Sequence, residues 1–373
     1  MNRRLQPQAD ISPAFSGQEV RFARAFALIR DAIDQHAFPG AALAVTHRGA
    51  LIVSQGFGCF TYDANSTPVH ADTGFDLASV TKVVATTAMA MVLYERGLLH
   101  LDSPVSGNLP EFVSRAPESQ QRDRKTVTVR MLLAHSSGLP AYVKLFASAH
   151  TRDELVRAAL ATPLVATPGS KADYSDIGFI LLGEMLSRIA RMPLDGFVHK
   201  EILTPLGMSR TCFNPSSELK AAIPPTEDDR TFRHRVIQGE VNDENAWVMG
   251  GVSGHAGLFA PALDVARFAE CMLRGGSPIF QPATVELFTR RQESPAGTSR
   301  ALGWDTPSQP SSSGSQFSPR SFGHLGYTGT SLWIDPDRRL SVTLLTSRTW
   351  PDRSSPAIKQ VRPRLHDAIV EAL

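Results

Sequence analysis

The sequence predicts an α/β fold of the α+β kind, in which a mostly antiparallel sheet is flanked by helices and an all-helical lobe is inserted. Three observations predict it. Segments 40–46 and 50–56 are joined by a tight turn and are typical of a β-hairpin. Two β-rich runs, 322–334 and 340–346, predict a second hairpin near the other end of the chain. Because the stretch between the hairpins is mainly helical, we expect one sheet built from both ends, with the helices beside it.

Helical spacing of apolar residues justifies the remaining elements in chain order. Helices are predicted at 20–36, from Ser79 to Gly97, at 128–135, 152–161, 177–191, 194–204, 262–274 and 283–290, and at the C-terminus. A polar, proline-containing stretch at 214–246 predicts a long loop of the kind that shapes a site or is mobile. The Ser- and Pro-rich segment 306–321 predicts a flexible loop.

The length of the chain allows one domain of complex topology or two interleaved lobes. The chain has 373 residues, of which 42% are hydrophobic. We expect an N-terminal extension at 1–19 and a main domain at 20–373. Within that domain, an α/β lobe is expected at about 20–80 and 250–373, and a helical lobe at about 81–249.

Composition excludes several classes of partner. A formal charge of +2 gives no reason to expect nucleic acid or an anionic membrane as a partner. No apolar run is long enough to span a membrane. Three cysteines, Cys59, Cys212 and Cys271, lack metal-ligand spacing. Residues 1–10 carry basic side chains without an apolar run behind them, so we expect a cytoplasmic protein, or a periplasmic or secreted one if a signal has been removed.

Ser79 stands before a segment that is apolar almost all round, which predicts a buried helix. Free N–H groups at the start of a helix favour developing negative charge. Lys82 follows at i+3 on the same face, and loss of solvation would lower its pKa and let it act as a base. A serine beside a base is the unit of nucleophilic acyl transfer.

The alternative is a helix-capping serine with a surface lysine. Ser-x-x-Lys is a weak motif alone, and it occurs again at 217–220, where we expect a solvated loop.

Two further segments complete a catalytic set. Tyr174 precedes a helix, and its hydroxyl could pass a proton once a nearby ammonium lowers its pKa; the alternative is a half-buried core tyrosine, with Asp176 as a helix N-cap. Around His324 and Gly326, glycines in a strand mark close approach of a ligand or backbone. The N–H groups of Tyr327 and Ser79 would then form an oxyanion hole, although a strand edge with turn glycines fits the same pattern.

Together these segments resemble the three motifs of the serine β-lactamase and penicillin-binding-protein superfamily. The motifs are Ser79-Val80-Thr81-Lys82, Tyr174-Ser175-Asp176 and His324-Leu325-Gly326, and the flanks at 131–139 and 205–208 agree. The class C-like branch, with its esterase, D-aminoacyl peptidase and muropeptide-amidase relatives, is the most similar.

The resemblance implies specific roles. Ser79 is the implied nucleophile, Lys82 the base and Tyr174 the general acid and base, with an acyl-enzyme resolved by water and no metal or cofactor. The implied substrate is a small amide or ester related to cell-wall peptides, such as a muropeptide or a β-lactam, and the resemblance implies no oligomeric state.

Two departures from the motifs of the related β-lactamases argue against an efficient β-lactamase. His324 and Leu325 replace the lysine and threonine of the third motif, so a permanent charge becomes a pH-dependent one. Asp176 replaces an asparagine, which should raise the pKa of Lys82 unless desolvation outweighs it. A true class C-like β-lactamase and a non-catalytic penicillin-binding or sensor protein remain the alternatives.

One more segment resembles the muropeptide-processing relatives. It contains Asp243 and Trp247, and His255 follows in a glycine-rich loop. These residues are equally compatible with lining a substrate cleft and with two structural features, a loop carboxylate pair at Asp243 and Glu244 and a hydrogen-bonded histidine.

Overall fold

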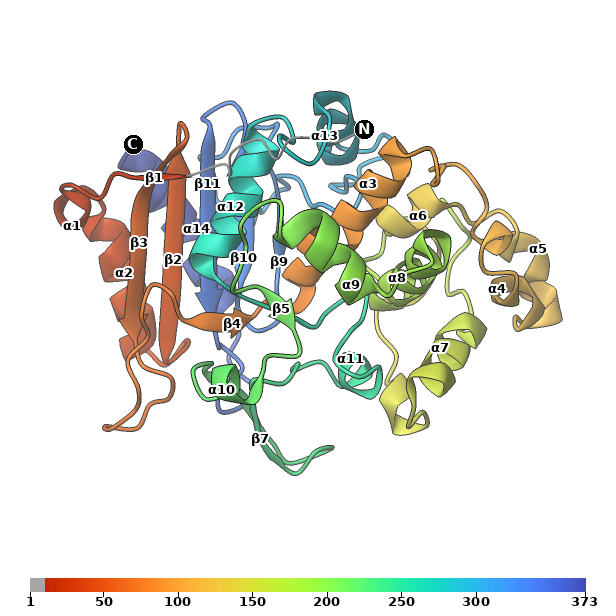
Figure 1. Cartoon of the computed structure of the whole chain (residues 1–373), viewed down its shortest axis with the longest axis horizontal. Coiled ribbons are helices and arrows are strands. Elements are labelled where there is room, and N and C mark those ends of the chain that lie inside the picture. Colours follow the sequence, from red (N-terminus) through yellow and green to blue (C-terminus); the bar gives the residue numbers. More distant parts are fainter. Residues whose placement is uncertain (1–10) are drawn as a thin grey trace.

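A six-stranded sheet assembled from both ends of the chain forms one side of the molecule (Figure 1). The computed structural model describes residues 11–373. The strand order is β1-β3-β2-β11-β10-β9, and every neighbouring pair except β1 with β3 is antiparallel. The strands are β1 (Ser12–Pro13), β2 (Gly40–His47), β3 (Ala50–Gly58), β9 (Phe322–Leu325), β10 (Ser331–Asp335) and β11 (Leu340–Thr346). Pairing of β2 with β11 joins the two predicted hairpins, so the predicted sheet is confirmed.

The N-terminal segment reaches the sheet. Residues 1–10, part of the predicted extension, lie outside the described residues. Ser12 and Pro13 pair with β3, and the predicted helix 20–36 is present as α1 (Gln18–Arg21) and α2 (Ala23–Asp34), which meet at Phe22. The division of the chain into an extension and lobes stays a prediction.

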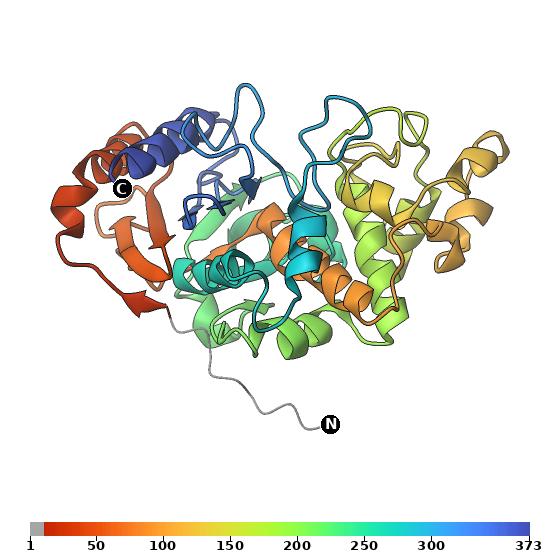
Figure 2. The ribbon, with the colours of Figure 1, turned by 90° about the horizontal axis from the view of Figure 1, so that it is seen from above.

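Helices cover both faces of the sheet. Helices α2 and α14 (Ile358–Glu371) lie side by side on one face, and α12 (Ala262–Leu273) covers the other (Figures 1 and 2). Alternate residues of a strand point to opposite faces. Accordingly Leu43 and Val45 pack in the cluster that contains α2 and α14, whereas Ala42 and Ala44 pack in the cluster that contains α12.

Most of the remaining helices gather beside the sheet (Figure 1). They are α3 (Ala88–Glu95), α4 (Glu111–Ser114), α5 (Gln121–Arg124), α6 (Val129–Leu133), α7 (Arg152–Ala161), α8 (Asp176–Ala190), α9 (Leu194–Val198) and α13 (Pro282–Thr289). The predicted helix 152–161 matches α7 to the residue. The predicted helix 194–204 continues past α9 as a wider π-helical stretch, His199–Leu203.

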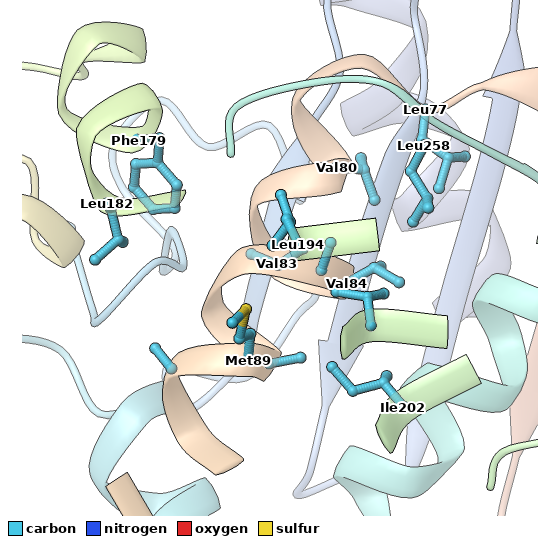
Figure 3. Close-up of a cluster of buried hydrophobic side chains, with 14 of the residues drawn as sticks. Leu77, Val80, Val83, Val84, Met89, Phe179, Leu182, Leu194, Ile202 and Leu258 are labelled. Carbon is cyan, nitrogen blue, oxygen red and sulfur yellow. The ribbon is translucent and has the colours of Figure 1, made fainter. Parts of the chain in front are cut away.

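The predicted buried helix after Ser79 is built from three helical types. A 3₁₀ turn (Ala78–Val80) leads into a π-helical stretch (Lys82–Thr87) and then into α3. Gly97 follows with φ 69°, the left-handed conformation that commonly ends a helix. Figure 3 shows apolar side chains of this segment, among them Val83 and Met89, surrounded by residues of other elements such as Leu182 and Ile202. Burial on all sides explains why the sequence is apolar all round.

Two predictions about local structure were wrong. The β-rich run 322–334 is two strands, because the chain turns between Gly326 and Thr330, where Gly329 adopts φ 100°. The stretch predicted as a loop at 214–246 contains α10 (Ser217–Lys220), the β6–β7 hairpin (Pro225–Asp229 and Arg235–Gln238) and α11 (Glu244–Val248). A two-stranded polar hairpin lacks a periodic apolar face, so periodicity did not reveal it.

A small second sheet connects the main sheet region to the helices. Its strands are β4 (Gly74–Asp76), β8 (Leu258–Pro261) and β5 (Cys212–Phe213), with β8 in the middle. Strand β4 leads directly into the Ser79 turn. In the described part of the chain, no helix is long and apolar enough to cross a membrane.

Candidate active site

Ser79 lies on a bend that a buried carboxylate holds in place. Ala78 has φ 45°, a left-handed conformation that is strained for a residue with a side chain. Asp76 stabilises the bend because its Oδ1 accepts a hydrogen bond from the Ala78 N–H at 2.8 Å, while its Oδ2 accepts one from the Asn242 N–H at 2.7 Å. Burial raises the pKa of Asp76 to about 6. Sequence analysis did not identify Asp76.

Lys82 is fully buried and makes three hydrogen bonds. Its Nζ donates to Ser79 Oγ at 2.9 Å, to Asp176 Oδ1 at 2.7 Å and to the His255 carbonyl at 3.0 Å. An ammonium has three donors, so the charged form of Lys82 is fully satisfied. Ser79 and Lys82 are in contact, as predicted. The alternative, in which Lys82 is a surface lysine, is wrong because its side chain is buried.

The predicted lowering of the Lys82 pKa is wrong. Burial is the largest single influence and lowers the pKa, but the opposing effects of Asp176 and Tyr174 together outweigh it and raise the pKa above the ordinary value. Lys82 is therefore an ammonium in the resting protein. The sequence already contained the reason, since Asp176 stands where the related motif has an uncharged asparagine.

Tyr174 packs against Lys82, and its pKa also departs from expectation. The Lys82 Nζ lies 4.9 Å from the centre of the tyrosine ring. Burial raises the pKa of Tyr174 more than Lys82 lowers it, so the predicted lowering is wrong and the hydroxyl is neutral at rest. A neutral phenol beside an ammonium can donate a proton, but it cannot accept one until the pair has lost a proton.

The N-cap of α8 is Ser175 and not, as the sequence suggested, Asp176. Ser175 Oγ accepts a hydrogen bond from the Gly178 N–H at 3.0 Å. Because Ser175 caps the helix, the Asp176 carboxylate is free to pair with Lys82. His135 is buried, and its Nδ1 accepts a hydrogen bond from the Ser175 N–H at 3.0 Å.

The turn between β9 and β10 is fastened to the Ser79 bend. Thr330 Oγ1 donates to the Leu77 carbonyl at 3.0 Å, and Thr328 Oγ1 donates to the Asp76 carbonyl at 2.8 Å. A Cβ on Gly326 would lie 2.6 Å from the Leu77 carbonyl oxygen, so this close approach requires a glycine.

Two backbone donors remain available on these neighbouring segments. Within residues 11–373, the N–H groups of Ser79 and Tyr327 donate to no protein acceptor. Both residues line the same cleft. An oxyanion hole requires free N–H donors of this kind. The predicted oxyanion hole itself stays a prediction.

His324 is a buried, neutral imidazole and not the expected pH-dependent cation. Its side chain is buried, and Nδ1 lies 2.8 Å from the Leu325 carbonyl. A carbonyl only accepts, so Nδ1 carries the hydrogen and Nε2 presents a lone pair, without a partner among the described residues. Burial, reinforced by the positive charges of Lys82 and Arg300, holds the pKa of His324 well below its usual range.

These residues surround a cleft of about 790 Å³. The lining contains the predicted residues Ser79, Tyr174, Asp176, His324, Gly326 and Tyr327, together with the acidic residues Asp243, Glu244 and Asp305 and the basic residues Lys144, Arg300, Arg348, Arg353, Lys359 and Arg362. The basic residues were not identified from the sequence, because they lie in irregular segments or on a helix with no motif around them.

The side chains of Trp247 and His255 are not part of the cleft lining. Trp247 is 38% exposed and donates from Nε1 to Glu240 at 3.1 Å. His255 is buried between Asp243 and Ser253, each at 2.8 Å, and contributes only its carbonyl to the site by accepting from Lys82. The expectation of a hydrogen-bonded histidine is confirmed, and Asp243 reaches the cleft in its place. Among the described residues, no group of three or more His, Cys, Asp or Glu side chains could hold a metal ion.

Comparison with known proteins places this cleft in a family. The family model described as Beta-lactamase matches residues 25–362. A putative D-alanyl-D-alanine carboxypeptidase of Salmonella agona (strain SL483) is 33% identical over 359 residues, which cover 86% of this chain and 81% of that protein.

Solved structures show the same fold at lower identity. EstCE1, described as a hydrolase with promiscuous acyltransferase activity, has a TM-score of 0.77 and 22% identity, covering 95% of this chain and 99% of its own. A penicillin-binding protein homolog from Caulobacter crescentus has a TM-score of 0.73 and 20% identity, covering 98% and 99%. Because the residues matched by the family model include the Ser79 bend and all the residues that line the cleft, this chain belongs to the Beta-lactamase family and is a serine hydrolase of the β-lactamase and penicillin-binding-protein class.

Proposed function

We propose that the protein cleaves a peptide-type amide through an acyl-enzyme on Ser79, with simple carboxylic esters as a second class of substrate. The observation that carries this proposal is the hydrogen bond from Lys82 Nζ to Ser79 Oγ at the wall of the cleft. The name of the Salmonella relative supports a peptide substrate, and the description of EstCE1 supports acyl transfer.

The resting site holds one proton more than attack by Ser79 requires. Lys82 is an ammonium and Tyr174 is a neutral phenol, so the pair must first lose a proton. Neutral Lys82 then accepts the Ser79 proton while Oγ attacks the carbonyl carbon. The N–H groups of Ser79 and Tyr327 bind the negative oxygen that develops.

Proton return completes the cycle. Tyr174 donates its proton to the leaving nitrogen or oxygen, and the Lys82 ammonium restores the tyrosine. Water then attacks the acyl-enzyme, gives its proton to the same pair, and the pair returns a proton to Ser79 Oγ. The carboxylate of Asp176 stabilises the ammonium form and thereby opposes the first deprotonation.

The alternative of an efficient β-lactamase is disfavoured by His324. In the related lactamases the third motif supplies a cation for the substrate carboxylate, whereas here that position holds a buried, uncharged imidazole. We therefore expect slow nitrocefin hydrolysis relative to ester hydrolysis.

The test is intact-protein mass spectrometry after mixing with p-nitrophenyl butyrate, a fluorescent penicillin or a muramyl peptide, with hydrolysis measured in parallel. We expect an adduct on Ser79 in the wild type and neither adduct nor turnover in Ser79→Ala. The variant should lose about 1–3 kcal/mol of stability, because the buried Lys82 ammonium loses one of its three acceptors.

Ser217→Ala is the matched control, because Ser217 begins the second Ser-x-x-Lys sequence and is exposed on α10. It should behave as the wild type. Unchanged turnover in Ser79→Ala would overturn the proposal, and adduct formation without turnover would support the binding-protein alternative.

A further inference from the structure

His135 holds the chain on both sides of Tyr174. The carbonyl of His135 accepts a hydrogen bond from the Asp173 N–H at 2.9 Å. Its side-chain Nδ1 accepts another from the Ser175 N–H at 3.0 Å. The backbone before and after Tyr174 is therefore attached to one residue, which comes from a different segment of the chain, just after α6.

The His135 ring also packs against Tyr174 itself. The centres of these two rings lie 4.7 Å apart, and the His135 ring stacks on Phe179 at 5.0 Å. The Lys82 Nζ lies 4.9 Å from the centre of the Tyr174 ring and 5.7 Å from that of Phe179. His135 therefore contacts both aromatic rings that flank the ammonium.

His135 is a costly residue at this position. Its backbone has φ 56°, a left-handed conformation that is strained for a residue with a side chain. Its side chain is buried, and Nε2 has no hydrogen-bond partner among the described residues. Burial, together with the positive charges of Arg300 and Lys82, holds the pKa of His135 well below its usual range, so the ring stays neutral and Nδ1 remains an acceptor. Packing alone does not require these costs, and backbone strain of this kind collects at functional sites.

We propose that His135 is a positioning residue, which directs the Tyr174 hydroxyl toward the leaving atom of the substrate by accepting the hydrogen bond from the Ser175 N–H. This inference rests on the proposed function, in which Tyr174 protonates the leaving atom. Proton transfer requires the donor to lie within hydrogen-bond distance, and a displacement of about 1 Å can lower a rate by about 100-fold. His135 is not among the residues that line the cleft, so it acts through Tyr174 and not on the substrate.

The test compares two esters of similar size whose leaving groups differ in basicity, p-nitrophenyl butyrate and p-methoxyphenyl butyrate. The p-nitrophenolate ion leaves without being protonated, whereas the more basic p-methoxyphenolate needs a proton from Tyr174. A misplaced tyrosine should lower kcat/KM by about 10- to 100-fold for the methoxy ester and by less than about threefold for the nitro ester. A simple loss of folded protein would lower both rates equally.

Two substitutions separate the hydrogen bond from the packing of the ring. His135→Asn keeps the acceptor, because Oδ1 of asparagine lies as many bonds from the backbone as Nδ1 of histidine, and asparagine tolerates a positive φ. This variant should keep the wild-type ratio of the two esters although it loses the ring. His135→Phe keeps a ring but leaves the Ser175 N–H without its acceptor, so it should lose activity selectively toward the methoxy ester.

Two further variants make the expected pattern specific. Tyr174→Phe should show the same selective loss, and adding His135→Phe to it should change the ester ratio little further, because both act through one hydroxyl. His366→Phe is the matched control, because His366 is also a buried histidine, its Nδ1 lies 3.0 Å from the Ser312 carbonyl, and it is not part of the cleft lining. Urea unfolding should show that His366→Phe loses stability, while its ester ratio stays that of the wild type.

The outcomes separate this inference from the proposed function. A wild-type ester ratio in His135→Phe, or an equal selective loss in His135→Asn, would overturn the role of the hydrogen bond while Ser79-dependent hydrolysis stands. If His135→Phe does not fold, His135→Gln takes its place, because its amide lies one bond further from the backbone and should show the same selective loss. If Ser79→Ala hydrolyses both esters as well as the wild type does, the proposed function itself fails.

Discussion

The resting charge of the site depends on one carboxylate, that of Asp176, which stands where the related motif has an asparagine. Lys82 is buried, and burial alone would favour its neutral form. Asp176 lies 2.7 Å away and, together with Tyr174, reverses that preference. We therefore expect hydrolysis by the wild type to rise with pH through the alkaline range, as the pair loses its extra proton.

Replacing Asp176 by asparagine should make the site easier to deprotonate. The Lys82 pKa would fall because burial would no longer be opposed by the carboxylate, so the rising limb of kcat/KM for p-nitrophenyl butyrate should move to lower pH and the rate at pH 7 should increase. A pH–rate profile from pH 6 to 10 measures this. Asp173→Asn, an exposed carboxylate paired with Lys171, is the control and should not move the limb.

Loss of activity in a folded Asp176→Asn variant would contradict this interpretation. It would show that hydrolysis needs the Asp176 carboxylate for more than setting the pKa of Lys82.

Asp76 should make stability depend on pH between about 4 and about 6. Its pKa is raised to about 6 in the folded protein, against 3.8 as its ordinary value, so the folded state binds a proton more tightly than the unfolded state. Stability relative to Asp76→Asn should therefore be greatest below about pH 4 and fall by about 3 kcal/mol as the pH rises through 6. Urea unfolding of both proteins across this range measures the difference, and a difference independent of pH would count against the raised pKa.

At the scale of elements, the geometry of the site depends most strongly on the position of the β9–β10 turn. A Cβ on Gly326 would lie 1.8 Å from Thr330 Oγ1 and 2.6 Å from the Leu77 carbonyl oxygen. Gly326→Ala should therefore push the turn away from the Ser79 bend, lower the ester hydrolysis rate by about tenfold or more, and cost about 1–3 kcal/mol of stability.

Gly107→Ala is the control, because Gly107 is exposed and a Cβ there meets nothing within 4 Å. Thermal unfolding and ester hydrolysis of the two variants are to be compared. Equal behaviour would mean that the contact between the turn and the bend does not position the site.

Elements with a strong apolar pattern were predicted well, and those without one were not. Helix α7 agrees with its prediction because its buried residues repeat at helical spacing. The β6–β7 hairpin was missed because it is mostly polar, and its turn is closed by Asp229, whose carboxylate accepts from the N–H groups of Thr231, Phe232 and Arg233. That carboxylate's role depends on the folded turn, so periodicity carries no signal of it.

At the scale of the whole molecule, the largest hydrophobic cluster extends from the sheet into the helices. It contains Leu332 of the sheet, Phe268 of α12, Met89 of α3 and Leu182 of α8. A continuous core couples the sheet and the helices energetically. We therefore expect both parts to unfold in a single cooperative transition.

Two probes can test this expectation. Trp333 lies on β10 and Trp304 packs against Phe322 of β9, and both are fully buried, so tryptophan fluorescence reports mainly on the sheet, whereas far-UV circular dichroism reports mainly on the helices. Coincident urea curves are expected. Loss of helical signal at a lower urea concentration than the tryptophan signal would show that the predicted lobes unfold separately.

The sequence by itself determined the sheet built from both ends, the buried helix after Ser79, and the family. These depend on hydrophobic periodicity, turn residues and three short motifs, all of which are local. Only the tertiary structure decided the protonation of Lys82 and Tyr174 and the neutral state of His324. Those properties depend on burial and on charges brought together from distant segments, and electrostatic energies change steeply with distance and solvent exposure.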